Sequence, residues 1–108
     1  MKNLSSIAQD VSELLIKRGE TVAISESSSG GLISAALLAV PGASRYFLGG
    51  GVVYTAVARE QLLSINFDDY PGIRSSSEPY AELAASTIKE RLGADWGLAE
   101  TGAAGPSG

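Results

Sequence analysis

The chain has 108 residues and a formal net charge of −4, with 44% hydrophobic and 19% charged residues. This length and composition fit a single soluble domain over residues 1–108 and exclude a disordered or fibrous chain. The eight basic residues are scattered, which argues against a nucleic-acid partner. Cysteine and histidine are absent, which excludes disulfides, thiolate nucleophiles, Ser-His-Asp triads and nearly every zinc site.

The sequence also argues against a membrane address. The first twenty residues contain Asp10, Glu13 and Glu20 and lack a long apolar core, unlike a signal peptide. No apolar run approaches the roughly 18 residues of a membrane span. We therefore expect a cytoplasmic domain with no membrane partner.

The N-terminal segment predicts a helix followed by a strand. Apolar residues recur at helical spacing over residues 4–15, Ser5 or Ser6 is the expected cap, and Gly19 is the expected stop. Residues 21–25 form a short β-branched and apolar run, which predicts a buried strand.

The hexapeptide E-S-S-S-G-G at residues 26–31 joins this strand to a second predicted helix. Residues 31–40 are almost wholly apolar and small, which predicts a buried helix packed closely on a sheet, and Pro41 and Gly42 end it. Three hydroxyls and two glycines at such a junction are compatible with a catalytic corner, a phosphate cradle or a plain turn.

The middle of the chain predicts a second strand and a loop region. Residues 46–55, Y-F-L-G-G-G-V-V-Y-T, predict a strand whose three glycines indicate a bulge or a close backbone approach. A short helix is expected over residues 56–64 and a surface loop over residues 66–76.

The last part of the chain predicts a long helix and a third strand. Ser77 is the expected cap of the helix and Gly93 its expected end, and residues 95–100 predict the strand. The apolar face of the helix consists of Tyr80, Ala84, Ile88 and Leu92.

Because helices alternate with buried strands, the predicted class is α/β, a three-layer αβα sandwich with a mixed, largely parallel sheet. A three-stranded sheet leaves apolar edges uncovered. We therefore interpret the domain as continuing past Gly108 or as completed by a partner, and we expect a homo-oligomer.

Four segments in the same order resemble the C-terminal domain of the competence and damage inducible protein CinA. T-V-A-I-S-E-S-S-S-G-G-L-I is similar to the family's A-E-S-C-T-G-G-L, and V-P-G-A-S-R-Y-F to its P-G-S-S-x-x-F. G-V-V-Y-T is similar to its G-x-V-x-Y-S, and T-G-A-A-G-P-S-G to its S-G-I-A-G-P-x-G. The resemblance implies the family's fold, with further strands and a last helix beyond this chain. It also implies a nicotinamide-nucleotide amidase, which releases ammonia from nicotinamide mononucleotide without a metal or other cofactor.

The resemblance also assigns residues to the E-S-S-S-G-G corner. Amide hydrolysis needs an activated nucleophile, donors for the oxyanion and a proton carrier. By the resemblance, Ser27 is the nucleophile, and Ser29, Gly30 and Gly31 supply donors at the start of a helix. The alternative is that the serines cap the helix and the glycines let it pack.

One residue departs from the family where the family places its general base. The family has Y-S-N-E-A-K, whereas this chain has Y-T-A-V-A-R, which keeps Tyr54 and replaces the lysine with Arg59. Arginine stays protonated and cannot act as a base, but it can bind a phosphate or carboxylate in a bidentate way. The remaining lysines, Lys2, Lys17 and Lys89, fit solvated positions on amphipathic helices.

A second departure places a carboxylate near the same corner. Glu100 stands where the family has an apolar residue, so Glu26 and Glu100 both follow predicted strands at the edge where α/β proteins bind ligands. We hypothesise that both glutamates and Arg59 cluster around Ser27, with one glutamate pairing Arg59 or acting as the base. The alternative is that Glu100 is exposed at the start of a loop.

Two further groups complete the predicted site. Tyr54 follows the three glycines, which suggests a ligand nearby, although a strand tyrosine is more often a packed ring. Thr101, Gly102 and Gly105 form a glycine-rich loop suited to holding a phosphate or ribose.

Three functions follow from these observations. The first is an amidase acting on a small-molecule pyridine nucleotide. The second is a nucleotide-binding module that has lost turnover together with the lysine. The third is a structural domain that a partner completes.

Overall fold

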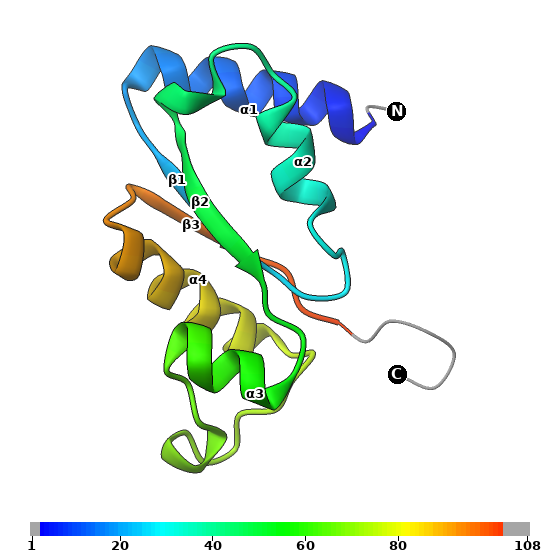
Figure 1. Ribbon diagram of the computed structural model, residues 1–108, viewed down its shortest axis with the longest axis vertical. Helices are drawn as coiled ribbons and strands as arrows, with labels where there is room; N and C mark the ends of the chain where they lie inside the picture. The colour runs from blue at the N-terminus through cyan, green and yellow to red at the C-terminus, as the bar shows by residue number, and fades with distance from the viewer. Residues whose placement is uncertain (1–2, 103–108) are drawn as a thin grey trace.

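The computed structural model describes residues 3–102 and has three layers, with α1 and α2 on one side of the sheet and α3 and α4 on the other (Figure 1). The main elements are α1 (Leu4–Arg18), β1 (Val22–Glu26), α2 (Leu32–Leu38), β2 (Phe47–Val52), α3 (Ala56–Ala58), α4 (Glu78–Leu92) and β3 (Trp96–Ala99). The strands lie in the order β2-β1-β3, and both pairings are parallel. The predicted α/β class is therefore confirmed, and every described pairing is parallel.

The residues at the ends of the two long helices determine where these helices begin and end. Gly19 and Gly93 end α1 and α4 in the left-handed conformation, with φ of 64° and 68°, and Ser77 caps α4, as predicted. The predicted cap of α1 was wrong. The Asn3 side chain accepts a hydrogen bond from the Ser6 amide at 2.8 Å, so Ser6 lies inside the helix, where a cap residue cannot be.

Strand β1 is the centre of the sheet and is buried at every position. Its register against β2 shifts between Val22 and Ala23, which pair with Phe47 and Gly49. A Cβ atom at Gly50 would lie 2.1 Å from the Ile24 carbonyl oxygen, so only glycine fits there. The bulge and close approach predicted from the three glycines are thus confirmed.

The side chains of β1 alternate between two cores, as the pleat of a strand requires. Ala23 packs in the core with α4, whereas Val22 and Ile24 pack in the core with α1 and α2. By the same alternation, Glu26 faces the α2 side and Ser27 the side of α3 and α4. Two consecutive residues of the E-S-S-S-G-G corner therefore enter different layers.

The prediction that the helix over residues 31–40 is buried was wrong. Helix α2 is seven residues long, and Leu37 is its buried residue, while Leu32 and Leu38 are 63% and 53% exposed. In α2 one face packs inward, and the apolar residues outside that face remain accessible. On the predicted apolar face of α4, Tyr80, Ala84 and Ile88 are buried, and Leu92 in the last turn is 40% exposed.

The segment between β2 and α4 is less regular than predicted. The expected helix over residues 56–64 begins as α3 and continues as a π-helical turn, Arg59–Leu63. The expected surface loop contains a 3-10 turn, Phe67–Asp69. Over residues 3–102, no helix combines the length and apolar character needed to cross a membrane.

Candidate functional site

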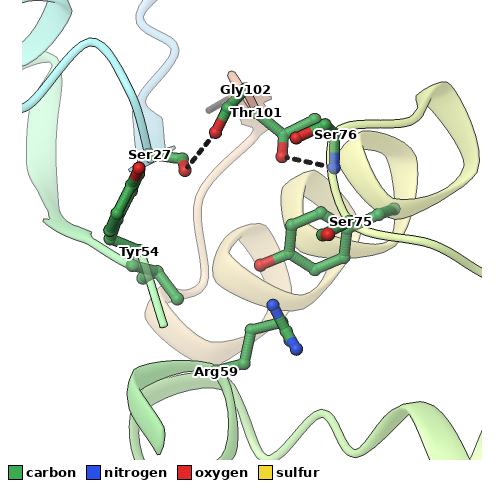
Figure 2. Close-up of a pocket in the computed structure, with 9 residues that line it drawn as sticks. Ser27, Tyr54, Arg59, Ser75, Ser76, Thr101 and Gly102 are labelled. Carbon is green, nitrogen blue, oxygen red and sulfur yellow. Dashed lines mark hydrogen bonds between the residues drawn. The ribbon is translucent and has the colours of Figure 1, made fainter. Parts of the chain in front are cut away.

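The candidate site lies at the carboxyl ends of the three strands, where open α/β sheets bind ligands. A pocket of about 200 Å³ opens there, between the corner after β1, the segment after β3, and the layer of α3 and α4. Figure 2 shows its main side chains. The lining residues are Ser27, Val53, Tyr54, Arg59, Ser75, Ser76, Tyr80, Thr101 and Gly102.

Ser27 lies on the wall of this pocket and is 8% exposed. Its Oγ donates a hydrogen bond to the carbonyl oxygen of Gly102 at 3.4 Å (Figure 2), and its amide donates to Glu100 Oε1 at 2.8 Å. Gly102 approaches closely, because a Cβ there would lie 2.6 Å from Ser28 Oγ. The segment after β3 thus fixes both the backbone and the hydroxyl of Ser27.

Glu26 lies on the opposite side of the corner, where it occupies the start of α2. Its carboxylate accepts hydrogen bonds from the Ile33 and Ser34 amides at 3.0 and 2.8 Å and from Ser29 Oγ at 2.7 Å. The side chain is 1% exposed, and this burial by itself would raise the pKa of Glu26. The hydrogen bonds outweigh burial and lower that pKa, so the group is an ionised structural carboxylate at neutral pH.

The Glu100 carboxylate accepts hydrogen bonds from a second group of donors, which the three serines of the corner supply. Oε1 accepts from the Ser27 and Ser29 amides at 2.8 and 3.0 Å, and Oε2 accepts from Ser28 Oγ. Ser29 Oγ lies within hydrogen-bond distance of both Glu26 Oε1 and Glu100 Oε1 and donates its single proton to one of them at a time. Desolvation opposes ionisation, but these bonds outweigh it and lower the pKa of Glu100 to about 2. Successive backbone amides of this kind form an anion-binding concavity, which the protein's own side chain occupies.

Arg59 reaches the pocket from the other layer (Figure 2), where it is the first residue of the π-helical turn. Its guanidinium carbon lies 3.9 Å from the ring centroid of Phe67 and 5.6 Å from that of Tyr80. Within residues 3–102 it forms no ion pair, so the hypothesised pairing of Arg59 with Glu26 or Glu100 is not found. The physical reason is that both carboxylates are held by the donors of the corner.

The predicted site residues therefore separate into two groups. The pocket brings together Ser27, Tyr54, Arg59, Thr101 and Gly102. The other predicted residues do not line the pocket: Glu26, Ser29, Gly30 and Gly31 form the corner behind it, and Glu100 is hydrogen-bonded to that corner.

Several donors expected at the corner are already engaged within the protein. The Ser29 amide donates to Glu100, the Ser29 hydroxyl donates to Glu26 or Glu100, and the Gly30 amide donates to the Ser27 carbonyl oxygen. Gly31 adopts φ of 101° and stands at the N-cap of α2 without a side-chain cap bond. Gly105 lies outside the described residues.

Sequence reasoning missed four residues of the pocket, Val53, Ser75, Ser76 and Tyr80. The serines lie in the predicted surface loop, and Tyr80 lies on the predicted apolar face of α4. Ser76 has φ of 55°, which is uncommon for a residue with a side chain, and its amide donates to Thr101 Oγ1 at 3.2 Å (Figure 2). The serine run before α4 is a signal in the sequence, but its distance from Ser27 along the chain hid the relation.

The described lining residues include no carboxylate, lysine or histidine. Lys17 and Lys89 lie on α1 and α4 away from the pocket, and Lys2 lies outside the described residues. Among its described lining residues, the pocket therefore combines hydroxyl groups with a single permanent cation, Arg59.

A parallel α/β sheet with a polar pocket at the carboxyl ends of its strands defines the class of this domain. The sequence model of the CinA C-terminal domain family matches residues 4–108, and the chain belongs to this family. It is 45% identical over 103 residues to a CinA-like protein of Prochlorococcus marinus, which covers 95% of this chain and 24% of that protein. A putative competence-damage inducible protein of Desulforamulus reducens is 43% identical over 101 residues, covering 94% of this chain and 25% of that protein.

Solved structures are similar over nearly the whole chain. The competence damage-inducible protein A (ComA) of Klebsiella pneumoniae superposes with a TM-score of 0.89 at 28% identity, covering 97% of this chain and 65% of that chain. The competence/damage inducible protein CihA of Agrobacterium tumefaciens superposes with a TM-score of 0.89 at 29% identity, covering 100% of this chain and 66% of that chain. The chain thus spans about a quarter of the curated relatives and about two thirds of these solved chains.

Proposed function

We propose that this domain binds a pyridine mononucleotide in the Ser27 pocket and hydrolyses its carboxamide, with Ser27 as the nucleophile. The supporting observation is the placement of the Ser27 hydroxyl on the wall of a polar pocket at the carboxyl ends of the strands. Tyr54, Thr101 and Gly102 line the same pocket and are the groups proposed to contact the ligand.

The proposed reaction proceeds in two balanced steps. Ser27 Oγ attacks the carboxamide carbon, the carbon–nitrogen bond breaks, and ammonia leaves with the serine proton. Water then hydrolyses the resulting ester, which gives the acid form of the nucleotide and restores the serine hydroxyl. The first step needs a proton acceptor near Ser27 and donors for the developing oxyanion.

The second candidate is binding of the same class of ligand without turnover, and the composition of the pocket favours it. No described lining residue is a lysine, histidine or carboxylate, and Arg59 cannot accept a proton. The amides of Ser27, Ser29 and Gly30 already donate hydrogen bonds within the chain. Turnover therefore lacks an evident base, whereas binding needs none.

The two candidates differ in one measurement, ammonia release from nicotinamide mononucleotide, made beside a thermal-shift titration with the same compound. An amidase releases ammonia, and Ser27→Ala abolishes the release, while Ser44→Ala, at an exposed position outside the pocket, leaves it unchanged. A thermal shift without release supports the binding function. If the chain releases no ammonia and shows no thermal shift, both candidates are refuted.

Arg59→Lys tests whether the missing base limits turnover. A lysine at this position regains a group that can lose its proton when its pKa is lowered, so we expect ammonia release to rise roughly 100-fold or more. Arg45→Lys, an exposed arginine outside the pocket, is the matched control. An unchanged rate in Arg59→Lys would mean that this position is not the site of the base.

A further inference from the structure

Arg59 is the charged centre of the pocket, and its electrostatic environment is one-sided. Arginine keeps its charge at all ordinary pH values. Among the described residues that line the pocket there is no acidic side chain to balance it. The nearby carboxylates of Glu26 and Glu100 are bound by the amides and hydroxyls of the corner instead.

Aromatic packing fixes the orientation of the Arg59 guanidinium. Its carbon lies 3.9 Å from the Phe67 centroid, and Phe67 packs edge-on against Tyr80 with centroids 5.5 Å apart. A ring beneath the guanidinium occupies one of its faces, whereas its N–H donors point outward in its plane. Within residues 3–102, none of these donors makes a hydrogen bond or ion pair, so the group is oriented but its donors have no described partner.

The backbone has an uncommon conformation on both sides of the pocket, at Arg59 and at Ser76 on the facing wall. Arg59 begins a π-helical turn, a rare geometry that is frequent at functional sites. The facing wall carries the hydroxyls of Ser75, Ser76 and Thr101 (Figure 2), and Ser76 has a positive φ. Hydroxyl donors beside a fixed guanidinium form the kind of site that binds a carboxylate or a phosphate.

We propose that Arg59, oriented by Phe67, is the receptor for an oxyanion of the ligand, with Ser75 and Ser76 as its hydroxyl partners. The position that would hold a base thus serves recognition, and the pocket selects ligands by a negatively charged group. For the pyridine nucleotide of the proposed function, which this inference deepens, the oxyanion is either the phosphate or the carboxylate of the acid form.

The test uses simple probes on the full chain at constant ionic strength. Inorganic phosphate and nicotinate each supply one of the two oxyanions, and nicotinamide is the neutral analogue of nicotinate. We expect the Arg59 Nε–H resonance in ¹⁵N-resolved NMR to shift with phosphate, with nicotinate or with both, and to remain unchanged with nicotinamide. Which anion acts shows which end of the ligand Arg59 holds.

Variants assign the effect to this residue. Arg59→Gln should weaken binding of the active anion roughly 10- to 100-fold, since a charge-assisted hydrogen bond is lost. Arg59→Lys keeps the charge but not the planar fork, so its anion affinity should lie between those of Arg59→Gln and the unmodified chain. Arg45→Gln should bind the anion as tightly as the unmodified chain does. The backbone NMR spectrum reports in each case that the variant is folded.

The inference is overturned if neither anion moves the Arg59 resonance, or if Arg59→Gln binds phosphate and nicotinate as well as the unmodified chain. This outcome is separate from the proposed function. Anion binding without ammonia release would refute the amidase and keep the receptor, and ammonia release without anion binding would do the reverse.

Discussion

The corner behind Ser27 and the pocket in front of it treat charge in opposite ways. In the corner, Glu26 and Glu100 bring negative charge to backbone amides and serine hydroxyls, and both carboxylates are fully engaged. In the pocket, Arg59 brings positive charge to a wall of hydroxyls and meets no described carboxylate. A region whose charges are matched internally serves structure, whereas a region with an unmatched charge is suited to a ligand.

The corner also shows why a phosphate-cradle sequence need not bind phosphate. Amides after a strand and at the start of a helix attract anions, and here they bind the chain's own carboxylates. The pocket lies on the other face of the same loop, where Ser27 points because side chains alternate along β1, and it is there that we propose the ligand binds. Three substitutions test this contrast between corner and pocket.

The largest effect is expected from Glu26→Ala. The substitution leaves the Ile33 and Ser34 amides without their acceptor in a site that is 1% exposed, and it opens a cavity. Each buried unsatisfied donor costs about 1–3 kcal/mol, so we expect the free energy of unfolding to fall by about 3 kcal/mol. Urea unfolding followed by circular dichroism measures this loss.

Glu13→Ala is the matched control for that experiment, because Glu13 is exposed and, among the described residues, its carboxylate accepts a hydrogen bond from the Gln9 side chain alone. It should change the free energy of unfolding by less than about 0.5 kcal/mol. Equal effects at the two positions would contradict the structural role of Glu26.

A smaller, pH-dependent effect is expected from Glu100→Gln. The pKa of Glu100 lies at about 2 in the folded chain, below its ordinary value of 4.5, so its stabilisation is complete above pH 4.5 and lost as the pH falls toward 2. The variant should be less stable than the unmodified chain at pH 7 by roughly 1–2 kcal/mol, as expected for a hydrogen-bonded charge. This difference should shrink steadily as the pH falls below 4.5.

Urea unfolding at several pH values between 7 and 3 gives the comparison for Glu100. The control is Glu82→Gln on α4, because Glu82 is exposed and its carboxylate has no hydrogen-bond partner among the described residues. A difference between the unmodified chain and Glu100→Gln that is independent of pH would show that the carboxylate charge is not what the corner requires.

The smallest effect is expected from Phe67→Leu, which removes the ring beneath Arg59 but keeps an apolar side chain. Loss of the cation–π contact, worth about 0.5–1 kcal/mol, should weaken binding of the active anion roughly two- to fivefold. Phe47→Leu, in the core with α1 and α2, should lower stability without changing anion affinity. Equal anion affinities of the two variants would contradict the orienting role of Phe67.

The sequence predicted most of the fold, because its signals are local. Ser77, Gly19 and Gly93 mark helix ends through their own conformational preferences, and three glycines at 49–51 indicate the bulge and close approach of β2. It failed at the cap of α1 and in the burial of α2. Ser5, Ser6 and Asn3 are equally good caps in isolation, and burial depends on which neighbours cover a helix.

The candidate site could be predicted only in part. The sequence identified Ser27, Tyr54, Arg59, Thr101 and Gly102, which the structure places around one pocket. It did not distinguish these residues from the glutamates. Adjacent residues at the end of a strand lie on opposite faces of the sheet, and the sequence alone did not show which face borders the pocket.

By itself, then, the sequence determined the alternation of helices and strands, the absence of histidine and cysteine chemistry, and an arginine in the place of a base. Only the tertiary structure decided how the charges are used. Glu100 meets Ser27 across 73 positions of the chain, and Arg59 meets Phe67 through a π-helical turn that no local pattern announces. The partners of a charge are chosen by the packing of distant segments, and those partners decide whether the charge holds the fold together or remains available to a ligand.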